Sequence, residues 1–260
     1  KLIPHINLDC SFPIWGGFIQ KRAGISRHDA VVWGYARAAS AAGVDIIQQC
    51  EVTGMQTSAS RVVSLQTTRG EIAADSFALC AAGHSGHLAA MAGLRLPISS
   101  LALQAMVTEP VKPILNVGLM SPRIHVYVSQ SDRGEIVIGG GADIFNSYAQ
   151  RGGLPVQQEN MQALLELMPI FGRLRMMRQW AGICDMAPDV SPIVGPTPLE
   201  NLYVSTGWGT GGYKAIPAGG DTLAYTIAHR EPHPLLRPFQ LSRFTSGRLV
   251  DEGAASGVAH

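Results

Sequence analysis

The residues with the clearest chemical potential lie in a short stretch near the end of the chain. Residues 207–212 read Gly-Trp-Gly-Thr-Gly-Gly, a G-x-G-x-x-G pattern that follows an apolar stretch and precedes a predicted helix. Glycines let backbone N–H groups approach a phosphate or a flavin ring, and a helix start favours negative charge. The pattern therefore predicts a wall that closes over a cofactor, and a tight turn without a ligand is the alternative.

A self-contained dinucleotide-binding unit is disfavoured at this place. Such a unit needs a second strand with an acidic residue about 20 positions further on. Glu231 stands at that distance, but it is followed by Pro232 and Pro234, which do not fit a central strand. An interpretation based on NAD binding by this pattern alone therefore fails, and we expect other residues to hold the cofactor.

Lys214 follows the glycines directly. The chain has only four lysines, and this one precedes the apolar stretch Ala215-Ile216-Pro217-Ala218. Burying an unpaired ammonium costs several kcal/mol, so the group needs an anionic partner or water. We consider two interpretations: a clamp for a substrate carboxylate beside the cofactor, or a surface lysine whose aliphatic part covers a helix start.

His28 stands between Arg27 and Asp29 in the first turn of a helix predicted over residues 29–42. The helix dipole disfavours the imidazolium form at this end, so we expect a neutral ring. A neutral imidazole has a free lone pair that could attack an electrophile or bind a metal, and Arg27 could hold a phosphate. A hydrogen-bonded structural histidine is the alternative.

The remaining candidate groups favour structural roles. His84 and His87 are three residues apart with no third ligand nearby, and Asp185 and Asp189 lie near prolines, where capping of a turn is favoured over acid–base catalysis. The four cysteines have no metal-binding or disulfide spacing. We therefore expect no metal site and a reducing, cytoplasmic compartment.

The composition excludes several classes of partner. The chain has 260 residues, 20 basic and 19 acidic side chains and a net charge of +1, which argues against nucleic acid or an acidic membrane surface as the main ligand. No apolar run is long enough to span a membrane. The charged fraction of 15% is low and there are 29 glycines, which together favour a cofactor enzyme with large interfaces.

Helices and strands alternate along the chain. Hydrophobic periodicity predicts helices over 29–42, 156–168 and 217–228 and a short helix that ends near Gly93. It predicts strands over 44–47, 61–67, 71–73, 77–81, 101–107, 124–129, 135–139, 174–184 and 202–205, and a Pro-rich extended tail. This order predicts a mixed α/β and α+β fold, in which a sheet-rich substrate region is inserted into a nucleotide-binding region.

Three motifs in this order resemble FAD-dependent amine and amino-acid oxidoreductases of the D-amino-acid oxidase fold. They are Ala81-Ala82-Gly83-His84-Ser85, the stretch 187–195 and the stretch 207–214. The segments 16–20, 27–31, 173–180, 231–235 and 258–260 are similar to the β subunits of heterotetrameric sarcosine oxidases. The resemblance implies a partial FAD-binding, glutathione-reductase-like domain (25–95 and 186–232), an inserted antiparallel-sheet substrate domain (1–24 and 96–185) and a C-terminal arm (233–260).

The resemblance also implies a role for particular residues. His28 stands where these subunits carry FMN covalently, and Lys214 stands where a lysine faces the substrate carboxylate over a non-covalent FAD. Tyr127 is expected to line the amine pocket as a second catalytic residue. The other expected cofactor-binding residues lie along FAD, at its adenosine part or near the FMN phosphate. They are Gly83, Gly207, Trp208, Gly209, Gly212, Tyr213, Val52, Arg27, Arg175 and Arg178. The three arginines are the candidates for the FMN phosphate, and they remain unranked.

The implied reaction is the oxidative demethylation of sarcosine to glycine. Electrons would pass from FAD to FMN to oxygen, giving hydrogen peroxide and a one-carbon unit for tetrahydrofolate or formaldehyde. The implied partners are α, γ and δ subunits, with NAD and tetrahydrofolate on the α subunit. Another FAD-dependent N-methyl amino acid or glycine oxidase or dehydrogenase, and a non-catalytic assembly fragment, are the alternatives.

One departure from the family pattern affects FAD binding. Members of this family begin with a strand, a Gly-rich turn and a helix that grip the FAD pyrophosphate, and no segment before His28 has this pattern. We therefore expect this chain by itself to bind FAD poorly and to show little oxidase activity.

Overall fold

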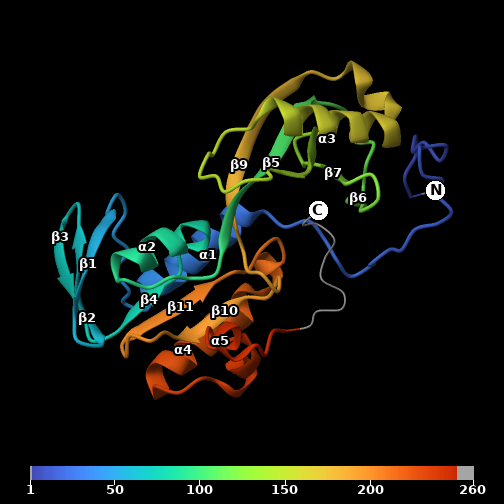
Figure 1. The fold of residues 1–260 in the computed structure, drawn as a ribbon. Coiled ribbons are helices and arrows are strands. Elements are labelled where there is room, and N and C mark those ends of the chain that lie inside the picture. The colour runs from blue at the N-terminus through green and yellow to red at the C-terminus, as the bar shows by residue number, and fades with distance from the viewer. Residues whose placement is uncertain (1, 251–260) are drawn as a thin grey trace. The chain divides into compact units, whose positions relative to one another are not determined.

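The computed structural model describes residues 2–250 (Figure 1). The motif at 258–260 and the end of the expected C-terminal arm lie outside these residues. The described chain divides into two compact units, the first comprising residues 2–50, 105–141 and 153–179, and the second comprising residues 51–104, 142–152 and 180–250. The domain boundaries expected from the sequence stay a prediction.

The first unit is built around an antiparallel sheet and a helix. The strands β6 (Leu119–Ser121), β7 (Val126–Gln130) and β8 (Glu135–Ala142) form a meander, which β5 (Ser99–Pro110) and β9 (Met176–Met186) extend in the order β6-β7-β8-β5-β9. Only residues 105–110 of β5 and 176–179 of β9 belong to the first unit. Figure 1 shows α3 (Leu154–Leu167) lying across this sheet. Alternate residues of β7 and β8 pack against α3 and η2 (Pro169–Arg173), and the buried core includes Val126, Val128, Ile136, Ile138, Leu164, Leu167 and Phe171.

The helix α1 (His28–Ala41) also belongs to the first unit and has no buried residue. The helix ends at Ala41 with Ala42 as its C-cap, and the following Gly43 has a φ of +90°, the left-handed conformation that stops a helix. The strand expected over 44–47 is wrong, because no described strand pairs with these residues and a strand needs a neighbour for its backbone hydrogen bonds.

The second unit contains two small sheets. In the first, β11 (Leu202–Thr206) pairs in parallel with β4 (Phe77–Leu79) and antiparallel with β10 (Ile193–Pro196), and α4 (Ile216–His229) packs beside β10 and β11. In the second, β1 (Val52–Ser58), β2 (Arg61–Thr67) and β3 (Gly70–Ala73) form an antiparallel sheet. The short elements η1 (Ala82–His84) and α2 (Ser85–Met91) follow β4.

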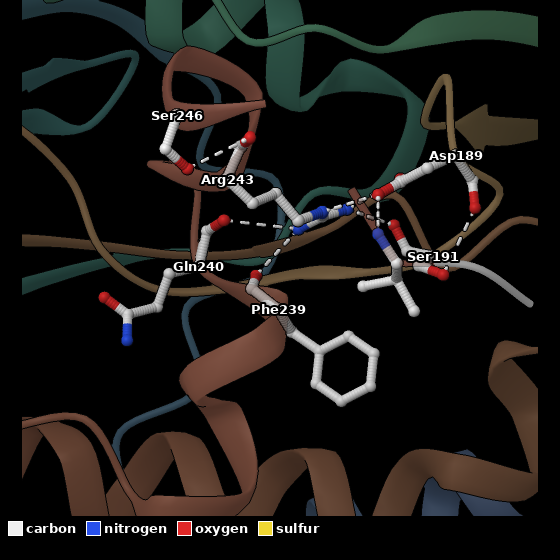
Figure 2. A network of polar contacts seen from close by, with 7 residues as sticks. Asp189, Ser191, Phe239, Gln240, Arg243 and Ser246 are labelled. Carbon is white, nitrogen blue, oxygen red and sulfur yellow. Dashed lines mark hydrogen bonds and ion pairs between the residues drawn. The ribbon is translucent and has the colours of Figure 1, made fainter. Parts of the chain in front are cut away.

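Most expected elements are confirmed within two or three residues of their bounds, whereas the strands β1, β6 and β10 were not expected. The tail is not extended over residues 234–246, because it forms η4 (Pro234–Phe239) and α5 (Arg243–Ser246). Arg243 attaches these turns to the body of the unit through an ion pair with Asp189, which Figure 2 shows from close by.

Candidate functional site

The Gly-rich turn after β11 is held from inside by Asp185. The Asp185 Oδ2 atom accepts hydrogen bonds from the Thr206 hydroxyl (2.8 Å) and from the Gly207 amide (2.5 Å), and the Asp185 carbonyl accepts one from the Gly209 amide (2.9 Å). Gly207 and Gly209 have φ values of +72° and +55°, which glycine adopts without strain. Because a buried acidic residue binds these two amides, they are not available to a phosphate.

Trp208 packs toward the start of α4. Its Nε1 atom donates a hydrogen bond to the Ser205 hydroxyl (2.9 Å). A Cβ atom at Gly212 or Gly219 would come within 2.7 Å or 2.9 Å of Trp208, so both positions leave room for its side chain. Gly212 therefore has a packing role in this structure, beside the cofactor role expected from the sequence.

Lys214 lies in the short helical turn η3 (Gly212–Ala215), directly before α4, and is exposed. No hydrogen bond or ion pair joins it to another residue of the described chain. The positive end of the α4 dipole is an unfavourable neighbour for an ammonium group. An anion placed here would interact favourably with both the helix end and the lysine.

The surface around Lys214 is apolar and open. Tyr213 and Ile216 are 45% and 40% exposed, and Pro217 is exposed beside them. A Cβ atom added at Gly211 would meet nothing within 4 Å. This strip, which consists of residues 211–217, presents one cation on an uncovered apolar surface.

Tyr127 lies in β7, opposite Gly139 of β8 in the antiparallel register. Its ring lies so close above Gly139 that a Cβ atom there would collide with it. Burial raises the pKa of the Tyr127 hydroxyl above its ordinary value. The ring is therefore fixed by its packing, with a neutral hydroxyl at physiological pH.

His28 is the first residue of α1 and is exposed. Its neighbours Arg27 and Asp29 form an ion pair of 3.4 Å between two exposed side chains. The hydrogen bond from the Ala30 amide lowers the pKa of Asp29, with smaller contributions from Arg27 and His28. Among the described residues, the His28 ring has no hydrogen-bond partner. Because the residue is also exposed, the ring is accessible to a ligand from solvent.

The other expected site residues are placed as follows. Arg175 and Arg178 have exposed side chains, just before and within β9. The Arg175 carbonyl accepts a hydrogen bond from the Glu109 amide, and the Arg175 amide donates one to the Glu109 carboxylate. Val52 is the half-buried first residue of β1. Gly83 is buried in η1, where a Cβ atom would collide with Ile183. Their expected roles stay predictions.

Comparison with known proteins identifies the family. Residues 1–226 match the family described as FAD dependent oxidoreductase. The chain belongs to this family. The expected membership and the mixed α/β fold are thereby confirmed.

Two curated relatives of this FAD-dependent oxidoreductase are 50% identical to it. They are sarcosine oxidase subunits beta from Rhodobacter capsulatus and from an Arthrobacter species, and the matches cover 100% of this chain. The chain spans 63% and 65% of the lengths of these relatives. An L-proline dehydrogenase from P. horikoshii shares its fold, with a TM-score of 0.77, 23% identity and coverage of 85% of this chain and 60% of that one.

The 211–217 strip suits part of the cofactor that this family uses. A flavin ring is flat and largely apolar, so it fits an open apolar surface such as this strip. The amides of Gly207 and Gly209 do not suit the FAD pyrophosphate, since Asp185 binds them. The residues present therefore fit the ring end of FAD.

A cleft of about 1250 Å³ lies elsewhere in the second unit of this FAD-dependent oxidoreductase. Its walls come from residues 93–99, 101, 186–188, 190, 196–198, 240–242, 244 and 245. None of the site residues expected from the sequence lines it, so we do not assign the reaction to this cleft.

The sequence predicts a turn near prolines for both Asp185 and Asp189. This is confirmed for Asp189, but it is wrong for Asp185, which lies in β9, where the chain still pairs as a strand, and whose carboxylate binds the Gly207 amide of a distant turn. The contact of Asp185 with the Gly-rich turn was not expected from the sequence. No group of three or more His, Cys, Asp or Glu side chains in residues 2–250 could hold a metal, and the four cysteines are free. None of the helices in the described part of the chain combines the length and apolar character needed to cross a membrane.

Proposed function

We propose that this chain is part of a flavin-dependent enzyme that oxidises sarcosine to glycine, as the β subunit of a heterotetrameric sarcosine oxidase. The observation that carries the proposal is the 50% identity over the whole chain with sarcosine oxidase subunits beta from two organisms. A likeness of this extent includes the segments around His28, Lys214 and the Gly-rich turn, which together contain most of the expected site.

Lys214 is proposed to bind the substrate carboxylate. An exposed ammonium with no protein partner, placed where the α4 dipole also attracts an anion, supports this role. Hydrogen bonds between charged groups of this kind orient a small zwitterion strongly. Tyr127, with its ring held above Gly139, is proposed to line the pocket for the amine.

Two flavins are proposed, a non-covalent FAD along residues 207–213 and an FMN attached to His28. When bound, they supply the redox chemistry, in which electrons from the N-methyl group pass through FAD and FMN to oxygen to give hydrogen peroxide, with the carbon leaving for tetrahydrofolate or as formaldehyde. An exposed His28 without a hydrogen-bond partner supports attachment of FMN. Arg27, Arg175 and Arg178 are the proposed groups for its phosphate.

The proposed partners are the α, γ and δ subunits, with NAD and tetrahydrofolate on the α subunit. The first unit exposes large apolar side chains that a monomer would bury, among them Trp15 (95% exposed), Phe18 (94%) and Trp33 (60%). Large exposed aromatic side chains are enriched at surfaces that bind other proteins. A cytoplasmic location is part of the proposal and is supported by the four free cysteines.

The test is substrate profiling of the complete enzyme, produced together with its partner subunits. We expect sarcosine-dependent hydrogen peroxide formation, with much lower rates on glycine, L-proline and D-alanine. A clear preference for one of the other amino acids would support a different oxidase or dehydrogenase of the family. Complete inactivity of a flavin-loaded complex toward all four would support a non-catalytic assembly role.

A further inference from the structure

We propose that Asp185 is a positioning residue that fixes the turn of residues 206–209 in the shape that FAD requires. The inference rests on the proposed function, in which this turn lies along FAD. Asp185 itself would not touch the cofactor, because its carboxylate lies behind the turn and is only 3% exposed.

The geometry of the contact supports a positioning role. Asp185 is near the end of β9 and binds a turn that lies 22 residues further along the chain. Its carboxylate binds the first part of the turn, through Thr206 and Gly207, and its carbonyl binds Gly209. An isolated antiparallel bridge between Met186 and Trp208 adds a further link. One residue therefore determines the backbone path on both sides of Trp208.

Packing alone does not explain a buried carboxylate at position 185. Burying a carboxylate is costly unless it is paired, and no Lys or Arg of the described residues forms an ion pair with Asp185. Burial and the negative charge of Asp185 raise the pKa of the neighbouring Cys184 to about 11. A buried carboxylate that has no cationic partner and binds two donors of one turn favours a role in holding the shape of that turn.

Asp189 provides a matched control within the same unit. Its side chain is also 3% exposed, but Arg243 neutralises it and its contacts lead to the C-terminal helical turns (Figure 2). Substitution of Asp189 should therefore lower stability without changing the 206–209 turn.

The test uses the holoenzyme and measures the FAD dissociation constant and the visible flavin spectrum, without substrate. We expect Asp185→Ala to weaken FAD binding about 10- to 100-fold and to shift the flavin bands, since hydrogen bonds to a charged group are lost. Asp185→Asn, which keeps an acceptor oxygen, should restore most of the affinity. Thr206→Val, which removes one donor, should weaken binding by about 3- to 10-fold and remains informative if Asp185→Ala does not fold.

Equal FAD affinity in Asp185→Ala, Thr206→Val and wild type would overturn the inference, as would equal effects of Asp185→Ala and Asp189→Asn on affinity. A wild-type holoenzyme without bound FAD would overturn it too. Sarcosine turnover of the wild type is measured separately. If that turnover is absent while FAD is bound, the proposed function fails, and the FAD titration still decides the role of Asp185.

Discussion

Asp189 and Arg243, which stand 54 residues apart, form an ion pair with two hydrogen bonds and almost no solvent exposure. The Arg243 Nε and Nη2 atoms lie 2.7 Å and 2.8 Å from the two Asp189 carboxylate oxygens, and both side chains are 3% exposed. Arg243 donates further hydrogen bonds to the carbonyls of Ser191, Phe239 and Gln240 (Figure 2). The pair therefore attaches η4 and α5 to the turn that follows β9.

Breaking this pair should destabilise the protein strongly. Arg243→Met leaves the Asp189 carboxylate buried and unpaired, so we expect the free energy of unfolding to fall by about 3–5 kcal/mol in urea denaturation. Glu200→Gln is the control, because the Arg61–Glu200 pair is exposed and should contribute little. A similar loss of unfolding free energy in Arg243→Met and Glu200→Gln would contradict the argument that the buried pair contributes more than the exposed one.

The same pair should make stability depend on acidity. Burial by itself raises the pKa of Asp189, but the hydrogen bonds from Arg243 and the Val250 amide outweigh it and hold the pKa below its ordinary value of 3.8. The unfolded chain then binds a proton more readily, so this contribution is complete above that value and is lost as pH falls below it. Urea denaturation between about pH 3 and about pH 7 should show a smaller acid-induced loss in Asp189→Asn than in wild type.

Removal of the Lys214 charge should weaken substrate binding. We expect Lys214→Met to raise KM for sarcosine about 10- to 100-fold, because a charge-assisted hydrogen bond to the carboxylate is lost, with a smaller change in kcat. Lys112→Met, at an exposed position of the first unit, is the control and should leave KM unchanged. An unaltered KM in Lys214→Met would assign Lys214 to the surface role.

His28→Ala should abolish the covalent flavin attachment that we propose at this residue. Protein precipitated with acid should lose its yellow colour in this variant, and mass spectrometry should find no flavin-modified peptide. His87→Ala, which removes another exposed histidine, should keep the attached flavin. Covalent flavin in His28→Ala would place the attachment at another residue.

Substitution of Gly139 should displace the ring of Tyr127. An added methyl group collides with this ring, so Gly139→Ala should lower the free energy of unfolding by about 1–3 kcal/mol. The loss should be much smaller when Gly139→Ala is made in a Tyr127→Ala background, because the colliding ring is then absent. Gly182→Ala in β9 is a control, since a Cβ atom there meets nothing within 4 Å. If the losses of unfolding free energy in Gly139→Ala and Tyr127→Ala add up in the double variant, the contact between the two residues is contradicted.

The local elements could be predicted because their causes are local. The apolar periodicity of α4 and the strand before it places the Gly-rich turn at 207–212 and Lys214 at a helix start, and both are found there. Gly43, just beyond the end of α1, was also predictable locally, because glycine adopts the left-handed conformation that stops a helix. The expected strand at 44–47 was wrong, because an apolar run of four residues becomes a strand only where another strand pairs with it.

By itself, the sequence determined the candidate residues, and it placed Lys214 at a helix start, Tyr127 in a strand and the Gly-rich turn between a strand and a helix. Only the tertiary structure decided that Asp185 binds the turn around Gly207 and that Arg243 neutralises Asp189, which are contacts between residues 22 and 54 positions apart. Both acidic residues have the same local signal, a carboxylate near a proline. Their different roles follow from which donor the folded chain brings to each, and that depends on the packing of distant segments.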